Sequence, residues 1–313
     1  MIVTNKYNPS QVYKMYDPTR TLTLRNAFVK NMERRFNELI SVIKKTIVEN
    51  DAFGLLPGIQ THEMVPAGWQ AFNYKMSQEK IIKFMEWLQQ QVDSGILDIK
   101  VFEQAGTAIN SAWTNLYVAD SYKRGVIRAR YELQKLGLDI PSIEDTGGIS
   151  MAMTNPFHVD RLGIIFTRTY TDLKGITAAM DMQISRVLAQ GIADGDGPAL
   201  LARKLVAVIN GQGIGDLAIK DTLGRFIPAK VRAEMLARTE IIRAHHLATI
   251  QEYRNWAVFN VMVEAEVVTA GDDRVCPVCD ALAAGGPYTL DQIENMIPAH
   301  TRCRCIALPI IIN

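Results

Sequence analysis

The residues best suited to chemistry lie near the end of the chain. Cys276 and Cys279 form a C-x-x-C motif, and His300, Cys303 and Cys305 follow it in the pattern H-x-x-C-x-C. Two thiolates of a C-x-x-C turn reach one metal ion, and a second pair of ligands completes a tetrahedron with Zn–S distances of about 2.3 Å. The spacing therefore predicts one structural Zn²⁺ site.

The spacing leaves the fourth ligand and the state of the thiols open. Cys303 and Cys305 would point to the same side of an extended strand, so both can join the site, with His300 as a competing ligand. The alternatives to zinc are reduced thiols in a small core, or short-loop disulfides formed outside the cytosol. In each case the cysteines clasp a segment of about 50 residues, which is too small to fold unaided.

Mostly helical elements must position this cluster. Asp17 and Pro18 are expected to cap a long amphipathic helix, because apolar residues recur every three or four positions from Phe28 to Ile47. The Gly-rich run from Gly211 to Gly215 follows a helix and not a strand, so it predicts a turn and not a dinucleotide site. The further helices predicted are 77–95, 103–136, 157–170, 172–190, 199–210 and 229–256.

The periodicity changes to two at residue 261 and predicts a half-buried strand to 268, with a second strand at 305–311. The predicted fold class is α+β and predominantly α-helical, with long helices and a small C-terminal cysteine-stapled two-stranded module. Three domains are expected. They are an N-terminal helical region with a basic first helix (1–145), a helical domain (155–258) and the small cysteine module (259–313).

Composition excludes several classes of protein. The chain has 313 residues, and 48% of them are hydrophobic, so it can bury a core. Its 34 basic and 33 acidic residues give a formal net charge of +1, which excludes a generally polybasic nucleic-acid binder. No apolar run approaches the roughly 20 residues that span a bilayer, so a soluble protein without membrane contact is expected.

Local charge and polar pairs supply further candidates. Two basic groups could meet DNA phosphates or an acidic protein surface, or could simply be solvated helix faces. Glu240 can pair with Arg243 at i, i+3, while Arg238 is expected to bind Asp272 or Asp273 and lock the cysteine module to its helix. The two basic groups are Lys30, Arg34, Lys44 and Lys45, and Lys123, Arg124, Arg128 and Arg130.

Several of these motifs occur together and in order. In chain order, these motifs are Ala237-Arg238-Thr239-Glu240, then Asp272-Asp273-Arg274-Val275-Cys276-Pro277-Val278-Cys279, then Ile297-Pro298-Ala299-His300 and Cys303-Arg304-Cys305. Residues 16–21 and 48–54 add a looser match. In this combination the sequence resembles the phage head morphogenesis family of Mu F-like minor head proteins, from which it departs at Thr301, where the family more often has proline.

The resemblance implies a structural minor capsid protein and no catalytic reaction. It implies portal and other capsid proteins as partners, contact with packaged DNA, and a place in the phage head near the portal after assembly in the host cytoplasm. The alternative is a zinc-stapled HNH-like nuclease in which His300 activates water, with Asp272 or Asp273 as the second group. A free-standing DNA-binding protein is a third hypothesis, disfavoured by the net charge.

Overall fold

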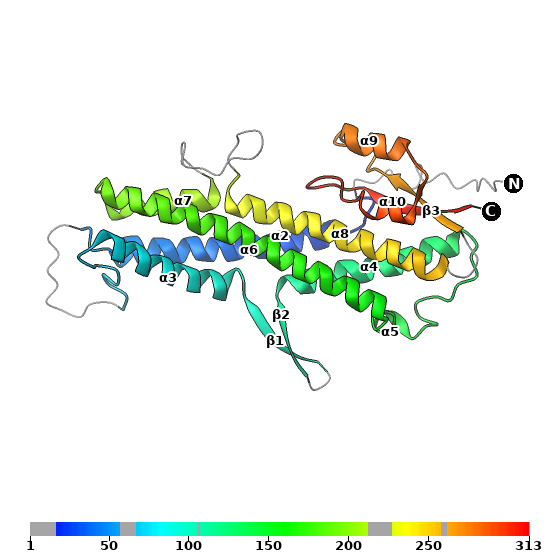
Figure 1. The fold of residues 1–313 in the computed structure, drawn as a ribbon, viewed down its shortest axis with the longest axis horizontal. Coiled ribbons are helices and arrows are strands. Elements are labelled where there is room, and N and C mark those ends of the chain that lie inside the picture. Colours follow the sequence, from blue (N-terminus) through cyan, green and yellow to red (C-terminus); the bar gives the residue numbers. More distant parts are fainter. Residues whose placement is uncertain (1–16, 57–66, 105–106, 212–226, 258–261, 313) are drawn as a thin grey trace. The chain divides into compact units, whose positions relative to one another are not determined.

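The computed structural model describes residues 17–56, 67–104, 107–211, 227–257 and 262–312 (Figure 1). Contacts within the chain define two compact units, each assembled from separate stretches of sequence. The first unit comprises Met1–Phe28, Trp113–Thr169 and Met235–Asn313, and the second comprises Val29–Ala112 and Tyr170–Glu234. The third expected domain, 259–313, lies inside the first unit, and the expected division into three domains stays a prediction.

Outside the cysteine module, four helical stretches of the described part of the first unit contribute side chains to one apolar cluster. They are α4 (Thr114–Lys135), α5 (Gly148–Ala152), the beginning of α6 (Pro156–Ala193) and most of α8 (Ala229–Ala257). Tyr122 and Val126 of α4 pack with Ala244 and Ala248 of α8. At Gly125 the two helices approach so closely that a Cβ atom would collide with the His245 carbonyl oxygen.

The first unit also contains the start of α2 (Leu22–Lys44) and the small module that carries the cysteines, residues 262–312. Its strands β3 (Met262–Val268), β4 (Tyr288–Thr289) and β5 (Ile306–Ile312) form an antiparallel sheet in the order β4-β3-β5, with α9 (Pro277–Ala284) and α10 (Leu290–Glu294) beside it (Figure 1). The predicted alternation holds, because Val263, Ala265 and Val267 are buried. The predicted fold class is confirmed, with β4 as an additional short strand.

The second unit contains the remainder of α2 (Leu22–Lys44), the π-helix η1 (Lys45–Glu49), α3 (Ser77–Gly95), the end of α6 and α7 (Pro198–Asn210). A hairpin of β1 (Ile99–Gln104) and β2 (Thr107–Ala112) follows α3. In the core of the second unit, the rings of Phe53, Phe72 and Phe84 pack against one another. Among the residues described, no helix has both the length and the apolar content to cross a membrane.

Three predicted boundaries were wrong. The helix expected from 103 to 136 begins at Thr114, because the preceding residues pair as the β1–β2 hairpin, and Leu116 is 60% exposed. The helices expected at 157–170 and 172–190 are one continuous helix, α6, since no Gly or Pro interrupts them between Tyr170 and Asp172. Residues 17–20 form a turn before α2, in which the Asp17 carboxylate accepts a hydrogen bond from the Leu22 amide.

Of the Gly211–Gly215 run, Gly211 is described and ends α7 in a left-handed conformation with φ of 89°. This is the position where a helix stop favours glycine. The remaining residues of the run lie outside the described ranges.

Candidate metal centre

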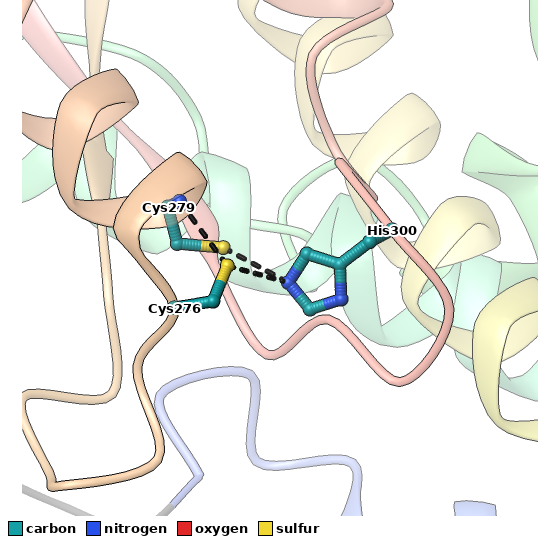
Figure 2. Close-up of side chains that lie close together, drawn as sticks. All are labelled: Cys276, Cys279 and His300. Atoms are coloured by element: carbon teal, nitrogen blue, oxygen red, sulfur yellow. Dashed lines mark hydrogen bonds between the residues drawn. The ribbon is translucent and has the colours of Figure 1, made fainter. Parts of the chain in front are cut away.

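The first two candidate ligands are held by the start of α9. Cys276 is the N-cap residue, and its Sγ accepts a hydrogen bond from the Cys279 amide at 3.4 Å, while Pro277 occupies the first helical turn. His300 comes from the loop between α10 and β5, and its Nε2 lies 3.3 Å from Cys276 Sγ and 3.2 Å from Cys279 Sγ (Figure 2). The turn and the loop therefore place three ligand atoms together.

The remaining two cysteines extend the same cluster. Cys279 Sγ lies 3.9 Å from Cys303 Sγ, and Cys279, Cys303 and Cys305 have their sulfurs within 4.8 Å of one another. All four cysteines are free thiols. Zn–S and Zn–N distances of about 2.3 and 2.0 Å in a tetrahedron place neighbouring ligand atoms roughly 3.5–3.8 Å apart. The observed separations fit that spacing, so the residues present suit a zinc ion.

Hydrogen bonds and burial lower the pKa values of two cysteine thiols and raise those of the other two. A hydrogen bond from Cys305 lowers the pKa of Cys303 to about 5, and the same contact together with burial raises the pKa of Cys305. The Cys279 amide lowers the pKa of Cys276, whereas burial raises the pKa of Cys279 to about 12. Because a coordinating thiol is deprotonated outright, a bound dication would convert the protonated sulfurs to thiolates as well.

The imidazole of His300 is oriented for ligation through Nε2. Its Nδ1 lies 2.8 Å from the Thr301 carbonyl oxygen and donates to it, which leaves the Nε2 lone pair facing the sulfurs. Burial lowers the His300 pKa, but the Thr301 carbonyl and the neighbouring sulfurs raise it by more. Since both ring nitrogens face other groups, the arrangement gives no support to His300 as the activator of water in a nuclease.

Asp272 and Arg304 tie together the two segments that carry the ligands. Arg304 donates to both carboxylate oxygens of Asp272, at 2.7 and 2.6 Å, and Arg274 adds a hydrogen bond at 2.8 Å. The hydrogen bonds from Arg304 hold the pKa of Asp272 far below its usual range. The expected partner of Asp272 was Arg238, which instead donates to Asn26 Oδ1 at 3.3 Å. Sequence reasoning missed Arg304, although it stands between two candidate ligands.

Polar contacts also fasten the cysteine module to α8. Arg254 donates to Asp291 at 2.5 Å and to Glu294 at 2.8 Å, and Arg161 of α6 also binds Glu294. The Nε2–H of His246 donates to the Ile293 and Glu294 carbonyl oxygens at 3.0 and 3.2 Å. An apolar cluster beneath these contacts includes Ile242, Ile250, Tyr253, Ile293, Ile297 and Cys303. The module is therefore packed on α8 by side chains from several turns of that helix.

The other α8 candidates lie away from the sulfurs. Glu240 accepts from Arg243 at 3.0 Å, as the i, i+3 spacing predicts, but Glu240 is only 2% exposed, and Arg168 lies 3.9 Å away. His245 and His246 are both buried, and burial lowers their pKa values to about 3 and about 4. Neither histidine belongs to the Cys/His cluster.

The basic residues predicted to contact DNA or portal differ in their exposure to solvent. Lys30, Lys44 and Lys45 are exposed, and Arg34 is exposed and pairs with Glu38. In the first unit, Arg124 is exposed and Lys123 is half-buried.

The other two residues of the second basic group point into the first unit. Arg128 donates to the Pro18 carbonyl and lies 3.6 Å from Glu132, and Arg130 is buried. The structure thus does not place Arg128 and Arg130 on a surface that a partner could reach.

Arg130 belongs to a buried polar cluster that sequence reasoning missed. Glu252 accepts from Arg130 Nη2 at 2.7 Å and from Trp256 at 2.8 Å, and it lies 3.2 Å from His158 Nε2. The Tyr122 hydroxyl is 3.1 Å from His158 Nδ1. The cluster joins α4, α6 and α8, and part of it lines a cavity of about 350 Å³.

Fold and site together define a predominantly helical protein with a small α+β module clasped by a Cys/His cluster. Residues 182–308 match the family described as Phage Mu protein F like protein, and this range contains all five candidate ligands. This part of the chain is therefore similar to the Mu F-like family, as the motifs at 237–305 indicated, and the match supports a phage head morphogenesis protein. No curated protein and no solved structure matches the chain.

Proposed function

We propose that the protein is a structural, non-enzymatic minor capsid protein that docks at the portal vertex during head assembly and contacts packaged DNA. The observation that carries this proposal is the Mu F-like match over 182–308. The proposal implies that the protein is made in the host cytoplasm and ends in the phage head near the portal. Its partners are the portal protein, other capsid proteins and, through exposed basic side chains, DNA.

The Cys/His cluster is proposed to hold one structural Zn²⁺. Cys276, Cys279, Cys303, Cys305 and His300 offer five ligand atoms from two segments, which is more than a tetrahedron needs. A site that the protein can close entirely with its own ligands is typical of structural zinc and not of catalytic zinc, which keeps an open position for water. The ion would contribute folding free energy by joining α9 to the loop before β5.

Exposed helix faces are the proposed contacts with portal and DNA. In the second unit these are Lys30, Arg34, Lys44 and Lys45, and in the first unit the exposed Arg124 with its half-buried sequence neighbour Lys123. Arg124 and Arg34 each pair with an exposed carboxylate four residues away, an arrangement worth a few tenths of a kcal/mol. Such pairs exchange readily for phosphate or for an acidic protein surface, because their own strength is small.

Co-assembly tests this function. The full chain would be co-expressed with the portal, scaffold and major capsid proteins of the same phage genome, and proheads would be purified by sedimentation. The proposal expects the protein in the prohead fraction when portal is present and a strong reduction when portal is omitted. A protein that sediments alone in both cases contradicts portal docking, and metal-dependent nicking of plasmid DNA would contradict the non-enzymatic role.

A further inference from the structure

Two turns of the same length carry four of the five candidate ligands. Cys279 follows Cys276 by three residues, and its amide donates a hydrogen bond to Cys276 Sγ at 3.4 Å. Cys303 follows His300 by three residues, and its amide donates to the His300 carbonyl oxygen at 3.2 Å. A tight turn lets two residues with this spacing reach one metal ion, as C-x-x-C pairs do in zinc sites. The H-x-x-C turn therefore offers a second pair of the same kind.

The side chains of the two turns meet at distances that suit one ion. His300 Nε2 lies 3.3 Å from Cys276 Sγ and 3.2 Å from Cys279 Sγ (Figure 2). Cys279 Sγ lies 3.9 Å from Cys303 Sγ. These separations lie on either side of the roughly 3.5–3.8 Å edge of a tetrahedral zinc site. Because His300 Nδ1 donates to the Thr301 carbonyl oxygen, the Nε2 lone pair is directed at the sulfurs, where a cation would bind.

The fifth candidate, Cys305, lies outside both turns. It directly precedes β5, is 4% exposed and belongs to the apolar cluster beneath the module. Its thiol donates to the sulfurs of Cys303 and Cys279, and the contact with Cys303 lowers the pKa of Cys303 to about 5. The same contact and burial raise the pKa of Cys305. A thiol that donates in this way keeps its proton, whereas a cysteine that ligates zinc has lost it.

The cost of buried charge favours the same division of roles. Cys303 is 1% exposed and Cys305 is 4% exposed, so thiolates at both positions would place two negative charges in an apolar cluster. His300 is exposed and can ligate as a neutral imidazole. With His300 in the ligand shell instead of Cys305, the site carries one thiolate fewer. The Cys305 thiol then remains available to hydrogen-bond the buried thiolates.

We propose that Cys305 is not a zinc ligand but a positioning residue, whose thiol donates hydrogen bonds to the thiolates of Cys303 and Cys279. The zinc ligands are then Cys276, Cys279, His300 and Cys303. This inference rests on the structural Zn²⁺ of the proposed function, and it goes further by giving each of the five side chains its own role. Partners of this kind fix the orientation and basicity of the ligands that they contact.

X-ray absorption at the zinc edge of the full-length wild-type protein tests the ligand assignment. The expected shell has three sulfur atoms at about 2.3 Å and one nitrogen atom at about 2.0 Å. A shell of four sulfur atoms without nitrogen would show that Cys305 ligates in place of His300, and would overturn the inference. This measurement needs no substitution, so its result does not depend on whether a variant folds.

Cys303→Ser and Cys305→Ser form a matched pair of variants, because the two cysteines are two residues apart and both buried. Zinc content is expected to fall strongly in Cys303→Ser. It should stay near one per chain in Cys305→Ser, where the hydroxyl group can still donate. If both variants lost zinc equally while the melting temperature showed Cys305→Ser to be folded, the ligand assignment would be wrong.

Cys305→Ala tests the hydrogen bonds themselves. Removal of the donor is expected to weaken zinc binding about 10- to 100-fold in competition with a chelator, with the ligand shell unchanged, whereas Cys305→Ser should restore most of the affinity. Equal affinities for the serine and alanine variants would overturn the donor role. A wild-type protein that contains no zinc would refute the proposed metal site and this inference with it. A zinc-loaded protein with a different shell would refute the inference alone.

Discussion

Arg304 binds both carboxylate oxygens of Asp272 across 32 residues of sequence, at 2.7 and 2.6 Å. Asp272 precedes the C-x-x-C turn, and Arg304 stands between Cys303 and Cys305. The pair therefore joins the same two segments that the metal would join, and it does so without metal. Its planar, two-fold geometry is the strong form of an arginine–carboxylate contact.

Asp272→Asn is expected to lower the melting temperature and weaken metal binding, because it removes one charge from this contact. The folded-state pKa of Asp272 is depressed, so its contribution is present above the unfolded pKa of about 4 and is lost as the pH falls further. Thermal unfolding from pH 7 to pH 3 measures this. The neighbouring exposed Asp273→Asn is the matched control, and equal melting temperatures for the two variants would contradict the structural role of the pair.

Glu252→Gln should destabilise the first unit strongly. Glu252 is 1% exposed and receives hydrogen bonds from Arg130 and Trp256, so the substitution leaves a buried guanidinium without its counter-charge. Breaking a buried pair in this way costs about 3–5 kcal/mol. Denaturant unfolding measures this loss of stability. The control is Glu86→Gln, because Glu86 forms an exposed ion pair with Lys83, and it is expected to change the free energy of unfolding by less than about 0.5 kcal/mol. If Glu252→Gln changed the free energy of unfolding only slightly, the buried polar cluster would not be important for the stability of the first unit.

Gly125→Ala and Gly163→Ala should act in opposite directions. A Cβ at Gly125 would collide with the His245 carbonyl and the Ala248 side chain, so α4 and α8 must separate, at a cost of about 1–3 kcal/mol. A Cβ at Gly163 in α6 meets nothing within 4 Å, and alanine there gains about 0.5–1 kcal/mol of helix stability. The two free energies of unfolding compare directly, and a neutral Gly125→Ala would contradict the close packing of α4 on α8.

Sequence patterns correctly predicted the structural features that depend on residues close to one another in the sequence. The alternation at Val263, Ala265 and Val267 predicted β3, and the C-x-x-C motif with the later cysteines predicted one cluster. The helix expected to follow Pro228, from 229 to 256, matches α8, Ala229–Ala257. In these cases the spacing itself determines which side chains share a face.

Such patterns could not predict which side chains distant in the sequence would contact each other. Arg130 was a candidate contact for DNA or portal, with a solvated helix face as the alternative, yet it binds Glu252, which is 122 residues away. Arg238 was expected to bind Asp272 or Asp273 and so lock the module to its helix, but Asp272 binds Arg304 of the module itself. The part of the β1–β2 hairpin after residue 103 was predicted to be the start of a helix, because a short run of residues can fit a helical period as well.

The central claim is that a metal ion clasps the cysteine module, and zinc analysis of the full-length protein tests it most directly. Elemental analysis after purification without added metal is expected to give about one zinc per chain, reduced strongly in Cys276→Ser and retained in the exposed control Val278→Ala. Removal of zinc by a chelator should lower the melting temperature. A metal-free protein that is fully folded, with four thiols that react freely, would contradict the claim.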